Sequence, residues 1–276
     1  NLEHRGATGY DPETGDGAGI LLQVPHAFFS SVVKGLPEAG AYGVGMVFLP
    51  QNAKSRTVCE QTLERHVRAE GLEIIAWRDV PVRPEAVGEL GRGSMPFIRQ
   101  VFVGCGKVAA ERLDRHLFIA RKLAENEVRI SGLDGREQFY LPSCASKVIV
   151  YKGLMRSFRV AQFYPDLESP LVVSALALVH QRYSTNTFPA WPLAQPFRFI
   201  SHNGEINTLR GNMNWMTARQ GLLKSELFGT GLERLFPILT EGASDSAILD
   251  NAIELLYHAG RTLPHAVMML IPEAWH

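Results

Sequence analysis

The sequence has no apolar run near the roughly 20 residues that a helix needs to cross a bilayer. Its longest apolar stretches, residues 171–179 and 266–271, suit buried strands. It also lacks an excess of either charge, with 28 basic and 28 acidic residues, so no overall field attracts nucleic acid or an anionic membrane. We therefore expect a protein that binds neither nucleic acid nor a membrane.

Cysteine is scarce as well. Cys59, Cys105 and Cys144 are odd in number and widely spaced, which argues against a disulfide framework and against a CxxC metal site. We expect them to be small buried hydrophobic residues in a reducing compartment, the cytoplasm or a plastid stroma. Asn1 is not an initiator methionine and the chain stops at His276, so we expect a piece of a longer polypeptide, truncated at both ends.

Strands and helices are predicted in separate blocks, which favours an α+β fold over a doubly wound sheet. Apolar or β-branched runs predict strands over residues 20–24, 41–49, 72–77, 96–104, 146–151, 171–180 and 263–271, with a further short apolar segment at 197–201. Apolar residues at helical spacing predict helices over residues 53–70, 109–128, 212–228 and 244–258. Residues 41–138 are predicted to form a small inserted α+β subdomain.

A glycine-rich segment opens the chain, from the His-Arg-Gly motif around Arg5 to residues 14–19. A nucleotide-binding loop should follow a strand and open a helix, whereas these glycines precede a strand and no GK[ST] follows. Two interpretations stay open. The segment is either a tight loop that leads into a strand, or a loop that closes over a substrate through Arg5 or Asp16.

Three further segments carry polar residues of the kinds that build sites. Arg182 ends a strongly apolar segment, and its planar fork suits either a carboxylate ligand or a structural salt bridge. Asn203-Gly204 is typical of a type I′ turn, but an Asn amide and a Gly N–H also suit an oxyanion hole. Ser244 or Asp245 suits a helix N-cap, and Asp245 equally suits a ligand ammonium group.

These segments can be combined into one site for an amino acid. Arg182 would bind the α-carboxylate, Asp245 the α-amino group, and Asn203 with Gly204 the oxyanion formed at an attacked side-chain amide. The set lacks a nucleophile with a base.

The motifs RYST, HNG and SDS, in this order, resemble the class II glutamine amidotransferases, which are N-terminal-nucleophile hydrolases. Longer segments are similar to the large subunits of the glutamate synthases, and the resemblance covers nearly the whole chain. These segments are LEHRGA, TGDGAGILLQVPH, MMLIPEAW and residues 180–216 and 241–256.

The resemblance implies a four-layer αββα sandwich, here without its N-terminal strand. It also implies a cysteine nucleophile at the mature amino terminus, activated by its own α-amino group. The thiol attacks the glutamine carboxamide, ammonia leaves, and water hydrolyses the γ-glutamyl thioester to glutamate. By motif, Asn203 and Gly204 resemble the oxyanion hole, Arg182 and Asp245 the substrate clamp, and Thr185 a further substrate contact.

The nucleophile is expected upstream of Asn1, so the chain alone is expected to be inactive. The resemblance further implies ammonia transfer to 2-oxoglutarate in a synthase domain of the same polypeptide. That domain would bind FMN and an iron–sulfur cluster, whose ligands are not in this sequence. Electrons would come from a small subunit with NAD(P)H or from ferredoxin. Two alternatives remain: another class II enzyme, such as an amidophosphoribosyltransferase, or a noncatalytic amino-acid-binding domain.

Overall fold

The computed structural model describes residues 11, 13–182, 188–202, 206, 209–240 and 242–271. Its strands are β1 Ala18–Gln23, β2 Tyr42–Leu49, β3 Glu73–Asp79, β4 Phe97–Gly104, β5 Tyr140–Ala145, β6 Val148–Gly153 and β7 Ala177–Gln181. Its α-helices are α1 His26–Val32, α2 Ala53–Ala69, α3 Glu89–Gly93, α4 Leu113–Ile130, α5 Val160–Phe163, α6 Leu209–Arg219, α7 Asp245–His258 and α8 Leu263–Leu270.

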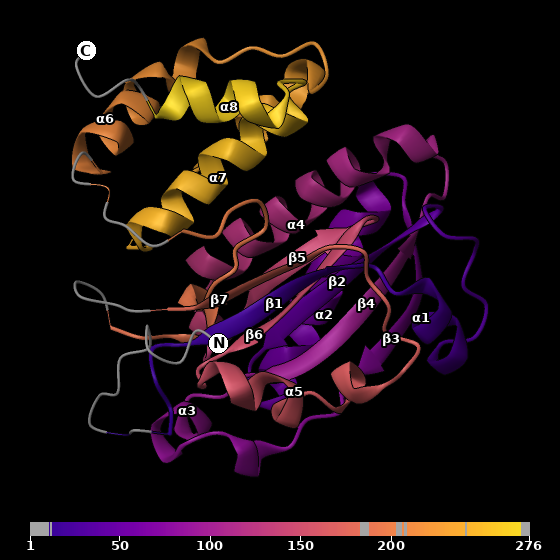
Figure 1. Cartoon of the computed structure of the whole chain (residues 1–276). Coiled ribbons are helices and arrows are strands. Elements are labelled where there is room, and N and C mark those ends of the chain that lie inside the picture. Colours follow the sequence, from indigo (N-terminus) through magenta and orange to yellow (C-terminus); the bar gives the residue numbers. More distant parts are fainter. Residues whose placement is uncertain are drawn as a thin grey trace.

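The strands form two antiparallel sheets that stack face to face (Figure 1). The first has the order β6-β1-β7, and Leu22 of β1 lies opposite Ile149 of β6. The second has the order β3-β4-β2-β5, and Val44 of β2 lies opposite Phe102 of β4 and Ala145 of β5. The antiparallel pairing of both sheets confirms the predicted α+β class, although helices alternate with strands as far as β7 and only α6–α8 form a separate block.

The two sheets meet in one apolar core. Because side chains alternate along a strand, every second residue of β2 points into it. Residues that face this core from both sheets include Ala18, Leu22, Val44, Met46, Phe48, Phe102, Ile149 and Tyr151. Burying each large side chain stabilises the stack by about 1.5–3 kcal/mol.

Helices α2 and α4 cover the outer face of the second sheet. Val47 and Leu49 of β2 pack there against Leu63 of α2 and Leu117 of α4. Helix α2 begins after Asn52, whose side chain accepts two backbone N–H groups of the first turn. This gives the helix–sheet–sheet order of an αββα sandwich. The predicted subdomain of residues 41–138 supplies β2–β4 and α2–α4. Strands β2 and β4 share the core with β1 and β6. That residues 41–138 form a separate subdomain stays a prediction.

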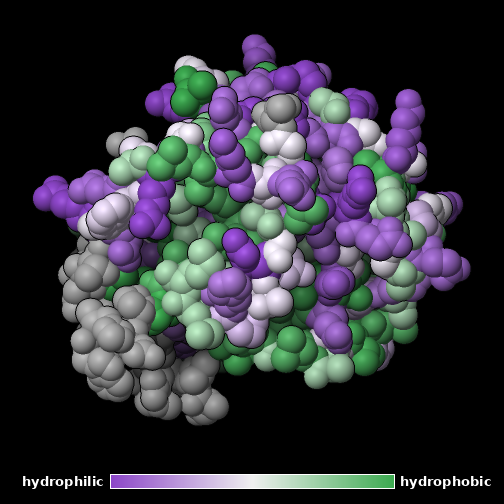
Figure 2. All heavy atoms as spheres, turned by 90° about the horizontal axis from the view of Figure 1, so that it is seen from above, coloured by the Kyte–Doolittle hydropathy of each residue, from purple (hydrophilic) through white to green (hydrophobic). Residues whose placement is uncertain are grey.

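Helices α6, α7 and α8 lie together beyond α4 (Figure 1). An apolar cluster joins Phe118 and Ile119 of α4 to Leu255 of α7 and to Leu235 and Ile238 of the preceding segment. Seen from the side of these helices, apolar and hydrophilic residues are interspersed over the surface (Figure 2).

The strand predicted over residues 263–271 is wrong, because this segment forms α8. The side chain of Thr262 caps the helix by accepting the N–H of His265 at 3.4 Å. Pro264 lies in the first turn, where a missing N–H removes no helical hydrogen bond. A short apolar run does not by itself distinguish a strand from a helix.

Two further predicted elements differ clearly in extent from the structure. The strand predicted to begin at residue 171 begins at Ala177, because the Ser174 hydroxyl accepts the N–H of Gln23 at 3.0 Å where a strand carbonyl would otherwise lie. The short apolar segment 197–201 forms neither a helix nor a strand, and within it the N–H of Phe197 donates to the carbonyl of Ile200 at 2.9 Å. The helix predicted over residues 212–228 is shorter and ends with α6 at residue 219, and β5 was not predicted.

Two glycines of the opening segment allow another part of the chain to approach β1. A Cβ on Gly19 would lie 2.5 Å from the Cβ of Lys152 and 2.8 Å from the carbonyl oxygen of Gln195. A Cβ on Gly17, whose φ is +112°, would lie 2.8 Å from the Cβ of Ala194. At these positions glycine is required by packing, as expected of a tight loop that leads into a strand.

We predict that Gly19→Ala lowers the free energy of unfolding by about 1–3 kcal/mol, since its new methyl group meets backbone on two sides. Gly211→Ala in α6 is the matched control, because its Cβ would meet nothing within 4 Å. That change should leave stability equal or raise it by up to about 1 kcal/mol. Chemical denaturation measures both, and equal stability of the two variants would contradict the packing role of Gly19.

Candidate active site

Arg182 directly follows β7. Its backbone N–H donates to the carbonyl of Gly17 at 2.8 Å, which ties the end of β7 to the loop before β1. Only 5% of Arg182 is exposed, and this burial lowers the pKa of its guanidinium. The carboxylates of Asp16 and Asp245 act in the opposite direction on that pKa. The structure therefore brings Arg182 and Asp245, which are far apart in the sequence, into one electrostatic environment.

Asp245 is the first residue of α7. The preceding residue, Ser244, is the N-cap, and its hydroxyl accepts the N–H of Ala247 at 3.3 Å. One carboxylate oxygen of Asp245 accepts the N–H of Ser246 at 2.7 Å, and the other accepts the N–H of Ile206 at 2.9 Å. A carboxylate is favoured here by the helix dipole. Asp245 thus ties residue 206 to the start of α7.

His202 is held from two sides by what we call the His202 clamp, formed by Gln195 and Ser246. The Gln195 side chain donates to the His202 carbonyl at 3.2 Å and accepts the His202 N–H at 3.0 Å. The Ser246 hydroxyl lies 2.7 Å from Nε2 of His202. Neither Gln195 nor Ser246 is predicted from the sequence as a site residue. Each lies in a segment that carries the family resemblance, but no spacing rule connects either to His202.

A buried charge cluster joins α4, α7 and the segment before His202. It consists of Arg121, Glu125, Arg198, Asp250 and Glu254, each with a side chain at most 6% exposed. Arg121 pairs with Glu125 and, at 2.6 Å, with Glu254. Arg198 lies 3.2 Å from Glu125, 3.6 Å from Asp250 and 3.9 Å from Glu254. Charges buried to this degree require such pairing.

The pKa values of two acids of this cluster shift in opposite directions, although burial acts on both in the same way. Burial raises the pKa of Asp250 to about 6, although Arg198 acts to lower it. Burial acts on Glu125 in the same direction, but Arg121 and Arg198 outweigh it and bring the pKa of Glu125 below its usual value. Asp250 also accepts the N–H of Phe199 at 2.8 Å. The cluster therefore fixes the backbone of residue 199 against α7.

Lys152 of β6 holds the segment that leads into Gln195. Its ammonium group donates to the carbonyls of Pro192 at 2.9 Å and Ala194 at 2.7 Å. Burial lowers the pKa of Lys152 well below its usual value. Its two hydrogen bonds fix the backbone immediately before the His202 clamp.

The remaining predicted site residues lie outside the described part of the chain. These are Arg5, Thr185, Asn203 and Gly204. The nearest described residues on either side of Asn203 and Gly204 are His202 and Ile206. The His202 clamp holds the first, and Asp245 holds the second. The predicted roles of the four stay predictions.

The three cysteines do not have the properties of a nucleophile. Burial raises the pKa of Cys59 and Cys144 to about 12, and it also raises the pKa of Cys105. A thiol held in its neutral form is a poor nucleophile. Cys59 is buried as predicted, whereas Cys105 and Cys144 are partly exposed.

Across the described ranges, no three His, Cys, Asp or Glu side chains gather where they could hold a metal ion.

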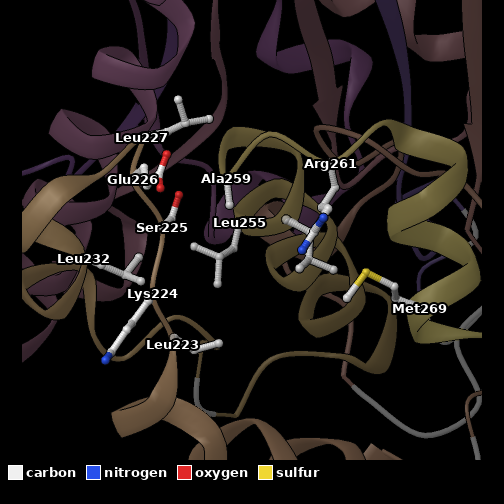
Figure 3. A pocket seen from close by; sticks show the side chains of 11 residues that line it. Leu223, Lys224, Ser225, Glu226, Leu227, Leu232, Leu255, Ala259, Arg261 and Met269 are labelled. Carbon is white, nitrogen blue, oxygen red and sulfur yellow. The ribbon is translucent and has the colours of Figure 1, made fainter.

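A cavity of about 530 Å³ lies elsewhere, between residues 223–232 and the C-terminal end of α7 (Figure 3). Its lining includes Leu223, Lys224, Glu226, Leu255, Arg261 and Met269. Neither Arg182 nor Asp245 lines it, so it does not coincide with the candidate active site.

None of the helices in the described segments has the length and apolar character of a membrane span.

A family model for class II glutamine amidotransferases matches residues 1–276. The chain is 49% identical over 278 residues to "Glutamate synthase [NADPH] large chain" from Bacillus subtilis, covering 99% of this chain and 18% of that protein. It is 43% identical to "Ferredoxin-dependent glutamate synthase" from Pyropia yezoensis, with 99% and 18% covered. It is 42% identical to the Azospirillum brasilense NADPH large chain, with 98% and 18% covered. The chain thus spans less than a fifth of the length of these relatives.

We predict a pH dependence of stability from His258, the last residue of α7. Its ring stacks on Phe118 with centroids 4.8 Å apart, and burial lowers its pKa to about 4 from 6.5. Between these values the unfolded chain binds a proton that the folded chain does not. The contribution of His258 to the free energy of unfolding should therefore fall by up to about 1.4 kcal/mol per pH unit as pH drops from 6.5 to 4.

His258→Phe keeps a stacking ring but removes this titration, so its stability relative to the parent should rise as pH drops from 7 to 4.5. His265→Phe, at an exposed position of α8, is the control and should keep the parent pH dependence. Urea denaturation at several pH values measures both. Parallel pH profiles for His258→Phe and the parent would contradict the assignment.

Proposed function

Because the chain belongs to the class II glutamine amidotransferases, we propose that it binds L-glutamine through Arg182 and Asp245 and supports release of ammonia from the glutamine side chain. In this reaction a thiol adds to the carboxamide carbon, the amide nitrogen leaves as ammonia, and water hydrolyses the resulting thioester to glutamate.

The observation that carries this proposal is the buried Arg182, tied at the end of β7 to Gly17 and under the electrostatic influence of the Asp16 and Asp245 carboxylates, which raise its pKa against the effect of burial. An amino acid presents a carboxylate and an ammonium group on one carbon. A guanidinium fork suits the first and a carboxylate suits the second. Two carboxylates beside one guanidinium would repel a phosphate, so the local charge favours an amino acid over a phosphorylated ligand.

We assign the oxyanion hole to Asn203 and Gly204, and a further substrate contact to Thr185. Support for the first assignment is that the flanking residues, His202 and Ile206, are both tied to the N-terminal turn of α7. Donors that are fixed before the reaction stabilise developing charge without reorganisation.

We assign the nucleophile to a cysteine at the mature amino terminus, upstream of Asn1, with its own α-amino group as the base. The raised pKa values of Cys59, Cys105 and Cys144 support a nucleophile other than these three.

For the whole polypeptide we propose a glutamate synthase, in which ammonia passes to a synthase domain and aminates 2-oxoglutarate. FMN and an iron–sulfur cluster would belong to that domain. The names of the relatives include both NADPH- and ferredoxin-dependent enzymes, so the electron donor is proposed only as one of these two. The length of the similarity, 99% of the chain, favours this assignment over an amidophosphoribosyltransferase.

We predict that Asn203→Ala in the full-length protein lowers kcat for ammonia release from glutamine about a hundredfold to a thousandfold, with little change in KM. The loss is expected because one donor to the developing oxyanion is removed. Asn214→Ala, at an exposed position of α6, is the matched control and should keep the parent kcat. Undiminished ammonia release by Asn203→Ala would refute the oxyanion assignment. A parent protein that binds glutamine without releasing ammonia would support the noncatalytic binding domain instead.

We predict that Asp245→Asn raises KM for glutamine about tenfold to a hundredfold, because a charged partner of the ammonium group is lost. The amide oxygen of Asn can still accept the N–H of Ile206, so kcat should fall less than in Asp245→Ala, which loses both interactions. Steady-state glutaminase assays separate the two parameters, with Asp134→Asn at an exposed position as the control. An unchanged KM in Asp245→Asn would exclude Asp245 from the substrate clamp.

A further inference from the structure

We propose that Gln195 is a positioning residue for the oxyanion hole, acting through His202. The inference rests on the proposed function, because it takes Asn203 and Gly204 as the oxyanion donors. Gln195 has no contact with substrate in this proposal. Its amide sets the direction in which the backbone leaves His202.

The geometry of the Gln195 amide supports this role. Both of its polar atoms bond to a single residue, with the nitrogen 3.2 Å from the His202 carbonyl oxygen and the oxygen 3.0 Å from the His202 nitrogen. This is the pattern with which a neighbouring strand pairs to one residue of an antiparallel ladder. One side chain thus holds both backbone polar groups of His202, which directly precedes the proposed donors in the sequence.

Gln195 is itself held in place. It is 5% exposed. Its backbone carbonyl oxygen packs against Gly19 so closely that a Cβ on Gly19 would lie only 2.8 Å from it. The preceding residue, Ala194, is fixed by the Lys152 ammonium group. A side chain on so constrained a backbone can transmit position accurately, and displacements of about 1 Å at a reacting centre can cost a hundredfold in rate.

The opposite side of His202 is fixed by α7. The Ser246 hydroxyl lies 2.7 Å from the imidazole Nε2 and also 3.3 Å from a carboxylate oxygen of Asp245. Asp250 and Asp245 hold the backbone at positions 199 and 206. Both flanks of positions 203–204 are therefore fixed to the first two turns of one helix, and Gln195 adds the bond to the carbonyl immediately before them.

The test uses Gln195→Met in the full-length protein, because Met is close to Gln in volume but lacks the amide. We expect kcat for ammonia release to fall about tenfold to a hundredfold, less than on losing a donor outright, with KM for glutamine within about twofold. Affinity for glutamate γ-semialdehyde, whose aldehyde forms a tetrahedral adduct with the catalytic thiol, should fall by a similar factor. Affinity for glutamate, which needs only the substrate clamp of Arg182 and Asp245, should not change. Gln61→Met at an exposed position of α2 is the matched control.

A double variant separates this inference from the proposed function. In an Asn203→Ala background, Gln195→Met should lower kcat by a clearly smaller factor than in the parent, because one of the two donors that Gln195 positions is already lost. Full additivity would overturn the positioning role, and so would a parallel loss of glutamate affinity, which indicates general disruption. If Asn203→Ala is impaired but Gln195→Met matches the parent, only the positioning role fails. If Asn203→Ala is unimpaired, the oxyanion assignment fails and this inference with it.

Should Gln195→Met not fold, Gln195→Asn is the second variant. It keeps an uncharged amide, but its side chain is one methylene shorter and cannot reach both backbone groups of His202 from the same position. The same loss of kcat and of aldehyde affinity is then expected, and parent values of both would overturn the proposal.

Discussion

Helix α7 is joined to α4 and to the segment before His202 by charges that are almost completely withdrawn from water. Arg121 and Arg198 lie among Glu125, Asp250 and Glu254, so two cations face three acids in a space lined by protein. Each of these charges would cost several kcal/mol to bury alone. They can be buried together only when α4, α7 and residue 198 take their places at once. The position of α7 is thereby tied to the position of the segment that leads to the site.

Most of the described features of the candidate site follow from where α7 begins. Asp245 and Ser246 lie on its first turn. The Asp245 carboxylate raises the pKa of Arg182 electrostatically, and the Ser246 hydroxyl contacts the His202 ring. Asp250, one turn further, belongs both to the charge cluster and to the bond that fixes residue 199. A helix placed by buried charges thus presents its N-terminal turn to His202 and Ile206, the described residues nearest to the proposed oxyanion donors. The same turn also bonds to backbone on both sides of positions 203–204.

Local sequence pattern predicted the long elements well. The helix expected over residues 53–70 is α2, and the strand expected over residues 41–49 is β2, because each has an uninterrupted pattern and clear boundaries. The pattern failed where the decisive contact is distant in sequence or supplied by a side chain. Ser174 and Gln23 interrupt the ladder before β7, and Thr262 with Pro264 turns a short apolar run into α8. Neither outcome is visible in hydrophobic periodicity.

The sequence by itself determined the family, and it predicted Arg182 and Asp245 as the two groups of the proposed substrate clamp, because a guanidinium and a carboxylate suit the two charges of an amino acid. It also predicted the α+β class correctly, since the content of strands and helices follows largely from local sequence patterns. Only the tertiary structure decided that Asp245 bonds to residue 206, that Gln195 and Ser246 hold His202, and that five charges meet between α4 and α7. Those contacts join positions as far apart as Arg121 and Glu254, and a pairing over that distance depends on how the layers pack.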